Sequence, residues 1–170
     1  AIVSLHRDRQ GRIWAGGYGR GSGLSCHDRG SFINYLRQDG LPDENIMGLA
    51  SDADGALWMA TYRGAAMLDT EGFLPWSARD GIDSGTVQQI TSTGDGSVWA
   101  LTSGQKLSRF DGATVSKITR ANGLPGTRPS SIFTDRDGAL LVSDEAAATA
   151  RCQPTAGESA RFEAIEDTLP

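Results

Sequence analysis

The 170-residue chain contains few of the features that mark nucleic-acid-binding proteins, membrane proteins or enzymes. It has 16 basic against 21 acidic side chains and a pI near 4.9, so no basic surface attracts a phosphate backbone and nucleic acid is not an expected partner. No apolar run approaches the roughly 20 residues that a membrane helix needs, so we expect no direct membrane insertion by this segment. Histidine, the usual acid–base catalyst near neutral pH, occurs only twice.

Cysteine is equally scarce, with Cys26 and Cys152 as its two copies. The sequence contains no C-x-x-C or H-x-x-x-H spacing, so we expect neither a metal site nor a cofactor. Both cysteines are predicted to lie in third strands at nearly matching positions, one in the first repeat described below and one in the fourth. We expect buried free thiols, because the two repeats are far apart in an open array, whereas a closed ring of four would make the cysteines neighbours.

The chain does contain an internal repeat, whose tight-turn glycines lie 44, 41 and 42 residues apart. The first marker, of the type Asp-x-x-Gly-x-hydrophobic-Trp, occurs at Asp8–Trp14, Asp52–Trp58, Thr93–Trp99 and Asp135–Leu141. A second marker resembling Asp-Gly-Leu-Pro follows in fixed phase at 39–42, 80–83, 122–125 and 167–170. A period in this range indicates an array of supersecondary units, none of which can bury its apolar face alone. We place the repeats approximately at 1–45, 46–86, 87–128 and 129–170.

Each repeat is predicted to form four short antiparallel strands. The D-x-x-G motif is typical of a hairpin tip, because glycine adopts positive φ without a steric penalty. Short apolar runs flank each tip, and a Gly-containing or polar break precedes a third and a fourth strand. The 22 glycines and six prolines disfavour long helices; a helical turn could form at Ala146–Ala150, which we interpret instead as a degenerate strand. The sequence therefore predicts an all-β protein, a β-propeller of about four blades with four antiparallel strands each.

These markers resemble the two-component regulator propeller repeat. The resemblance rests on the D-x-x-G-x-hydrophobic-Trp marker, on Gly23–Asp28 as a copy of Gly-Leu-x-x-x-Asp, and on the Gly-Leu-Pro connections. The chain departs from the pattern at Ala65-Ala66, at Gln105-Lys106 and over most of the fourth repeat. The resemblance implies an extracytoplasmic, periplasmic sensor segment of a bacterial receptor that carries a hybrid histidine kinase or diguanylate cyclase output domain. It also implies a small extracellular ligand, such as a carbohydrate.

Four blades are fewer than the roughly six to eight that are common in such propellers. Three arrangements are therefore open: a segment of a larger ring of six to eight blades, a compact four-bladed ring, and half of a ring that a second copy completes as a homodimer. We favour the larger ring, because the sequence begins within a first strand and stops where a fifth blade should begin. The partners of the segment are then the remaining blades and the output domain of the same receptor.

Two aromatic or glycine-rich features have structural explanations. Trp14, Trp58 and Trp99 occupy one position of an interior strand, as packing between blades requires, whereas Trp76 falls outside this phase. The glycine-rich segment Gly16–Gly23 joins two strands, so it lacks the strand-to-helix context of a phosphate loop. It is instead a three-residue expansion of the loop between the second and third strands, and such insertions collect on the working face of a repeat array.

Strand alternation predicts which loops form that working face. If each first strand runs away from it, the D-x-x-G tips lie on the opposite side, and the second-to-third-strand loops share one rim with the Gly-Leu-Pro connections. Tyr18 and Arg63 are the strongest ligand-binding candidates, because aromatic and guanidinium groups supply flat contact area and directional donors. The other candidates on this rim are Arg20, Tyr62, Asp43, Glu44, Asn45, Asp83, Arg128, Asp144 and Glu145.

We therefore expect a ligand-sensing segment that is not itself catalytic. His6 is predicted beside a D-x-x-G tip and His27 within a third strand, so neither reaches the rim. Streptogramin lyases, whose repeat pattern looks similar, would require a histidine on that rim. The alternative functions are a protein-interaction scaffold and a streptogramin-lyase-like enzyme fragment whose missing blades supply the chemistry.

Overall fold

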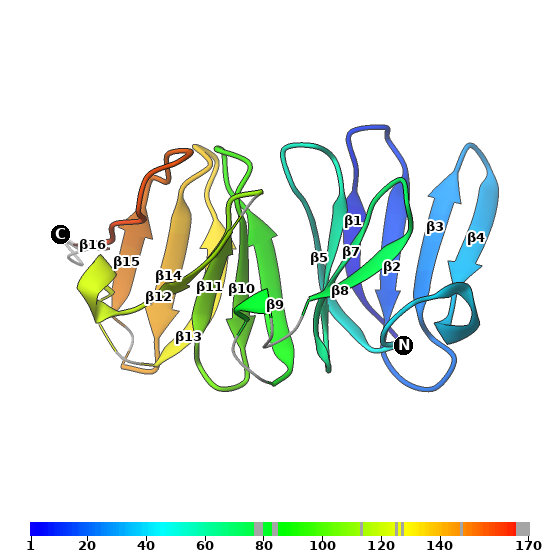
Figure 1. Cartoon of the computed structure of the whole chain (residues 1–170), viewed down its shortest axis with the longest axis horizontal. Helices are drawn as coiled ribbons and strands as arrows, with labels where there is room; N and C mark the ends of the chain where they lie inside the picture. The colour runs from blue at the N-terminus through cyan, green and yellow to red at the C-terminus, as the bar shows by residue number, and fades with distance from the viewer. Residues whose placement is uncertain are drawn as a thin grey trace, which may run out of the picture.

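The computed structural model describes residues 1–76, 80–82, 85–112, 114–124, 126, 128–146 and 148–165. These residues form four sheets of four antiparallel strands, so the predicted all-β fold is confirmed (Figure 1). The sheets comprise β1 (Ile2–Arg7), β2 (Ile13–Gly17), β3 (Leu24–Asp28) and β4 (Ser31–Tyr35); β5 (Ile46–Ser51), β6 (Leu57–Thr61), β7 (Gly64–Leu68) and β8 (Phe73–Trp76); β9 (Val87–Ser92), β10 (Val98–Thr102), β11 (Leu107–Phe110) and β12 (Val115–Ile118); and β13 (Pro129–Thr134), β14 (Leu140–Asp144), β15 (Thr149–Cys152) and β16 (Glu163–Ile165).

Each sheet is a simple meander in which neighbouring strands follow one another along the chain. The four sheets, called blades 1 to 4 here, stand side by side along the long axis of the molecule, with blade 1 at one end of the row and blade 4 at the other (Figure 1). The first strands β1, β5, β9 and β13 lie next to one another in that order. Short 3₁₀ helices, η1 (Arg37–Asp39) and η3 (Arg120–Asn122), lie between blades 1 and 2 and between blades 3 and 4. This is the blade arrangement of a β-propeller.

The D-x-x-G segments form the hairpin tips between first and second strands, as predicted. In blade 1 the Asp8 carboxylate accepts hydrogen bonds from the backbone N–H groups of Gln10 and Arg12 at 3.0 and 2.9 Å. Gly11 adopts a φ of +82°, which an L side chain rarely tolerates. Asp52 caps its own tip in the same way, through Oδ1.

The repeated tryptophans fill the junctions between blades, as expected from their common phase. Trp14, Trp58 and Trp99 are 2%, 4% and 0% exposed. Each belongs to the apolar cluster that joins its own blade to the following blade. Trp58 contacts Phe110 of blade 3 with ring centroids 4.7 Å apart. Trp76 lies in β8 and packs on Trp58 at 5.4 Å, so it belongs to the same junction.

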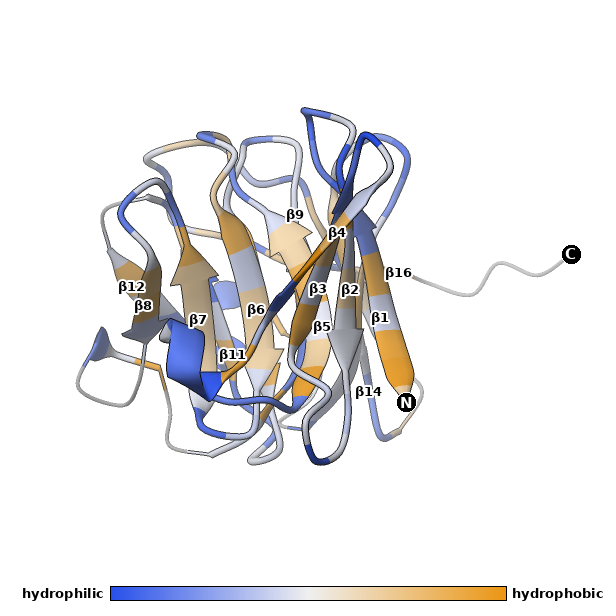
Figure 2. Ribbon diagram, turned by 90° about the vertical axis from the view of Figure 1, so that its right-hand side faces the viewer, coloured by the Kyte–Doolittle hydropathy of each residue, from blue (hydrophilic) through white to orange (hydrophobic). Residues whose placement is uncertain are grey.

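The free face of blade 1 carries apolar side chains that the other blades bury. Ile2 and Ile13 are 60% and 37% exposed, whereas Ile46 and Leu57, which occupy the same positions of blade 2, are 0% and 3% exposed. Figure 2 shows β1 on this face, strongly apolar near its N-terminal end. The larger ring remains a prediction, and this face has the composition of a blade junction.

The two cysteines are free and buried, as expected. The prediction that they occupy matching positions of blades 1 and 4, and would be neighbours in a closed ring of four, was wrong. Cys26 pairs with Trp14 across β2 and β3, so it faces blade 2. Cys152 pairs with Leu140 instead of Leu141, one position out of phase, and faces blade 3. Because the two side chains point in opposite directions around the array, closing four blades into a ring would not bring them together.

Ala146–Ala150, the stretch where a helical turn could form, enters a strand at its end. Residues 149 and 150 belong to β15, and residues 145 and 146 form a turn. Among the residues that the structure describes, no helix is long and apolar enough to cross a membrane.

Candidate functional site

The two sides of the blade row carry different loops, as strand alternation predicted. The D-x-x-G tips lie along one side, at the top of Figure 1, and the loops between second and third strands lie along the other. The connection through η1 lies on this second side, together with the chain that leads into β5. We call this second side the rim.

Tyr18 and Tyr62 meet on the rim across the junction of blades 1 and 2. Their hydroxyl oxygens are 2.7 Å apart and form a hydrogen bond. Their rings contact edge to face, with centroids 5.7 Å apart and an interplanar angle of 88°. Both rings remain about two-fifths exposed, at 41% and 44%. The hydrogen bond with Tyr18 raises the pKa of Tyr62, with smaller contributions from burial and from Asp43, so the Tyr62 phenol stays protonated at neutral pH.

A polar network anchored on Asp43 lies beside the tyrosine pair. The Asp43 carboxylate is buried, with 4% of its side chain exposed, while its partner Arg63 is 68% exposed, with Nε 3.6 Å from Asp43 Oδ2. Asp43 Oδ1 also accepts from the backbone N–H of Asn45 at 2.8 Å and from its side-chain amide at 3.2 Å. The Asn45 Oδ1 in turn accepts from the N–H of Gly19 at 3.0 Å. The network therefore fixes the expanded loop of blade 1 against the start of blade 2.

Glu44 also holds the expanded loop of blade 1, through hydrogen bonds to two of its glycines. Its Oε2 accepts from the N–H of Gly21 at 3.2 Å, and its backbone carbonyl accepts from the N–H of Gly23 at 3.1 Å. Gly23 has a φ of +56°, and a Cβ there would collide with the Tyr35 carbonyl oxygen. Glycine is thus required where the expanded loop returns to β3.

The remaining predicted residues do not join this cluster. Arg20 is exposed and makes no hydrogen bond or ion pair with a described residue. Asp144, two blades away, accepts from the N–H groups of Ala146 and Ala148 at 2.9 and 3.0 Å and so shapes its own turn. Glu145 is paired with Arg128 at 3.1 Å and also accepts from the Gln105 amide. Asp83 lies outside the described residues.

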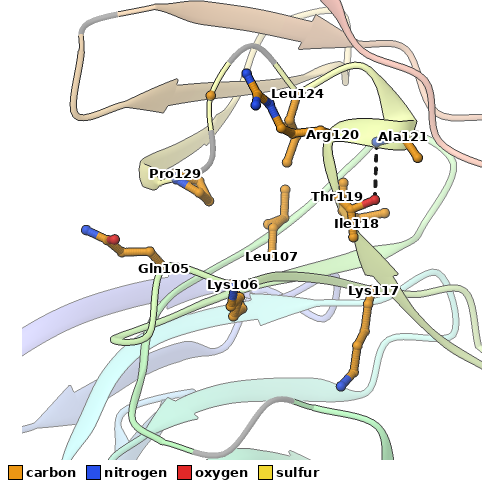
Figure 3. A pocket seen from close by; sticks show the side chains of 11 residues that line it. Gln105, Lys106, Leu107, Lys117, Ile118, Thr119, Arg120, Ala121, Leu124 and Pro129 are labelled. Carbon is orange, nitrogen blue, oxygen red and sulfur yellow. Dashed lines mark hydrogen bonds between the residues drawn. The ribbon is translucent and has the colours of Figure 1, made fainter.

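The rim also contains a hollow that sequence reasoning did not predict, at the junction of blades 3 and 4. It has a volume of about 380 Å³. Figure 3 shows Leu107 pointing into it, with Arg120 and Lys106 on different sides. Arg120 and Lys106 are exposed, and neither forms an ion pair with a described residue. No motif could have predicted it, because its lining comes from three separate segments: Gln105–Leu107, Lys117–Ala121, and Leu124, Gly126 and Pro129.

Neither histidine reaches the rim. His6 hydrogen-bonds through Nε2 to Ser51 Oγ at 2.7 Å across the junction of blades 1 and 2. Burial lowers the pKa of His6, although Asp8 acts in the opposite direction. His27 lies in β3 against Phe32, with ring centroids 4.7 Å apart. Within the described part of the chain, no three His, Cys, Asp or Glu side chains gather as metal ligands would.

The meandering blades, the indole-filled junctions and the loop-bearing rim give the chain the fold of a β-propeller. Solved propellers share this fold: virginiamycin B lyase from Staphylococcus aureus superposes with a TM-score of 0.72 at 20% identity, covering 99% of this chain and 56% of the lyase. The extracellular domain of a protein described as a hybrid two-component system from B. thetaiotaomicron gives 0.66 at 17%, covering 99% and 26%. YCF48 bound to D1 peptide gives 0.60 at 14%, covering 96% and 53%.

Residues 40–63 match the model of the two-component regulator propeller family, so the resemblance seen in the repeats is confirmed. These residues run from the Gly-Leu-Pro connection to the second strand of blade 2 and include the candidate residues Asp43, Tyr62 and Arg63. No curated protein matches the sequence. The chain spans 56% and 26% of the first two solved structures named above. Their superposition shows a common fold, and at such low sequence identity it assigns no activity to this chain.

Proposed function

We propose that this chain is the ligand-sensing propeller segment of an extracytoplasmic bacterial signalling receptor and is not itself catalytic. The observation that carries the proposal is the rim cluster of Tyr18, Tyr62 and Arg63, in which exposed tyrosines from two blades contact each other and the exposed arginine pairs with the buried Asp43 carboxylate. Such a cluster offers flat apolar area together with directional donors. It suits a small polar ligand with several hydroxyl or carboxylate groups, such as a carbohydrate.

The position of the cluster also suits a sensor. Tyr18 belongs to blade 1 and Tyr62 to blade 2, so a ligand that contacts both would favour one relative position of the two blades. A ligand shifts a conformational equilibrium only by its difference in affinity for the two states. A ligand that contacts both tyrosines would gain such a difference in affinity, because its contacts would bridge two blades instead of lying within one. An output domain in the same receptor would respond to that shift, and the periplasm is the proposed location.

The experiment is a binding screen of the purified chain against an oligosaccharide array and a set of short peptides. We expect saturable binding to a small polar probe, lost in the double variant Tyr18→Ala/Arg63→Ala. Arg136→Ala is the matched control, because Arg136 is an exposed arginine in a D-x-x-G tip on the opposite side. Binding that survives the double variant, or that Arg136→Ala abolishes equally, would contradict the proposed site.

The same screen separates the alternative functions. Capture of one folded protein with no small-molecule binding would support an interaction scaffold. Chemical conversion of a bound probe by this chain alone would show an enzyme and overturn the non-catalytic assignment. The virginiamycin B lyase likeness makes turnover a necessary readout, although both histidines of this chain lie off the rim.

A further inference from the structure

In blades 1, 3 and 4 an arginine of the same blade donates to a carboxylate of the D-x-x-G tip. The blade 2 tip instead receives Arg9 of blade 1 on the backbone carbonyl of Ala53, and no arginine of blade 2 pairs with its carboxylates among the described residues. In blade 1, Arg12 Nε donates to Asp8 Oδ2 at 2.6 Å, and its guanidinium lies 5.1 Å from the Trp14 ring centre. In blade 3, Arg109 Nη2 donates to Asp95 Oδ2 at 2.6 Å, and its guanidinium lies 5.6 Å from the Trp99 ring centre.

Blade 4 repeats the ion pair without the indole. Arg151 Nε donates to Asp135 Oδ2 at 3.0 Å, and Arg151 Nη2 lies 3.7 Å from Asp137 Oδ2. The sheet register places Arg151 opposite Leu141, as it places Arg109 opposite Trp99. Blades 1, 3 and 4 therefore each place a guanidinium on a tip carboxylate. Arg12 supplies it from just before the second strand, and Arg109 and Arg151 supply it from the third strand.

Blade 2 keeps the carboxylates and the indole but has no arginine at either position. Ala56 stands where blade 1 has Arg12, and Met67 pairs with Trp58 where Arg109 pairs with Trp99. The Asp52 Oδ2 accepts from Trp58 Nε1 at 2.8 Å, the same bond that Asp8 Oδ2 makes with Trp14, but it receives no guanidinium. Neither Asp52 nor Asp54 forms an ion pair with a described residue.

A hollow of about 220 Å³ lies at this place, between blades 2 and 3. Asp52, Asp54 and Asp69 line it, and none of these three carboxylates forms an ion pair with a residue that the structure describes. Its apolar wall is made by Met67 and by three mutually packed rings, those of Trp58, Trp76 and Phe110. Aromatic rings together with carboxylates are the surroundings that a guanidinium or alkylammonium group prefers.

We propose that this hollow is a binding site for a guanidinium group, such as an arginine side chain, which takes the place that the chain's own arginines occupy in the other blades. The site lies on the side of the D-x-x-G tips, opposite the rim, and is therefore independent of the proposed sensing site. Its internal precedent is specific: the chain itself binds guanidinium groups beside Trp14 and Trp99 through the corresponding carboxylates.

The test is a titration of the ¹⁵N-labelled chain with N-acetylargininamide, followed through the indole Nε1–H signals. The Trp58 signal, and that of Trp76, should shift saturably. The signals of Trp14 and Trp99 should stay in place, because Arg12 and Arg109 already pair with the carboxylates of those tips, although a hollow of about 460 Å³ also lies beside Trp14 and Arg12. N-acetylcitrullinamide, nearly the same shape without the charge, should shift none of them. A parallel titration with agmatine compares two sources of the guanidinium group. Tighter binding of agmatine would indicate a free guanidine, and tighter binding of N-acetylargininamide would indicate an arginine within a peptide.

Four variants complete the test. Asp54→Asn should weaken N-acetylargininamide binding about tenfold, the effect of losing roughly 1.4 kcal/mol, while Glu71→Gln, an exposed acid outside the hollow, should leave it unchanged. Met67→Arg should abolish binding by supplying the guanidinium from within. Arg12→Ala should open a second site, seen as a new shift of the Trp14 signal. Equal shifts with the citrulline and arginine probes, or no saturable shift of Trp58 in the wild-type chain, would overturn the proposal.

Discussion

Trp99 offers the sharpest test of how the blades are held together. Its side chain is completely buried, its Nε1 donates to Thr93 Oγ1 at 2.9 Å, and its ring meets Phe162 of blade 4 edge to face at 6.0 Å. Trp99→Ala removes a large ring that the surrounding strands cannot replace, so we expect a loss of roughly 3–5 kcal/mol in the free energy of unfolding. That is a large share of the roughly 5–15 kcal/mol that a whole domain typically has.

Urea unfolding followed by circular dichroism measures this loss, and two further variants divide it. Trp99→Phe keeps a ring but loses the Nε1–H bond, so it should cost less than the alanine variant and at least the roughly 1 kcal/mol of one hydrogen bond. Trp76→Ala, at a half-buried ring of the neighbouring junction, should also cost less than Trp99→Ala. If Trp99→Ala lost under about 1 kcal/mol, the indole would not be the main packing element of its junction, and the reasoning would be refuted.

Two other predictions concern backbone conformation and pH. Gly123 and Gly112 have φ values of +91° and +92°, but a Cβ at Gly123 would collide with the Phe162 carbonyl, whereas nothing lies within 4 Å of one at Gly112. Alanine at either position should cost the roughly 1–3 kcal/mol of backbone strain, and urea midpoints should show a clearly larger loss for Gly123→Ala; equal losses would exclude the collision. For Asp95, burial acts to raise the pKa, but the hydrogen bonds from Thr93 and Ser97 and the Arg109 charge outweigh it and lower the pKa. The stabilisation is present above the unfolded pKa of about 4 and is lost as pH falls through the lower folded value, so thermal melts below pH 4 should show a steep loss of Tm that Asp95→Asn flattens; an unchanged slope would contradict this.

The fold could be predicted from the sequence because its determinants are local and repeated. The D-x-x-G glycines require positive φ, and each tryptophan follows its turn at a fixed distance, so the position of one blade predicts the next. Which neighbouring blade each cysteine side chain faces could not be predicted in the same way. A shift of one residue in a strand reverses the face of every side chain, and neither Cys26 nor Cys152 has a marker that fixes its register.

The candidate site was predictable in part for a related reason. Tyr18 and Tyr62 stand at the same loop position of successive blades, so their meeting follows from the repeat. The buried Asp43 and its bond to Arg63 depend on the path of the connecting chain, which no local pattern specifies. The unfilled hollow beside Trp58 becomes visible only when side chains from two blades are compared, because Met67 by itself is an ordinary strand residue.

The receptor assignment is tested most directly by the size and location of the native polypeptide. An antibody raised to this segment would be used to blot soluble and membrane fractions of the source cells. We predict a membrane-fraction band several times larger than the 18.0 kDa of this chain. A soluble band at 18.0 kDa would contradict the receptor assignment and show a self-contained protein.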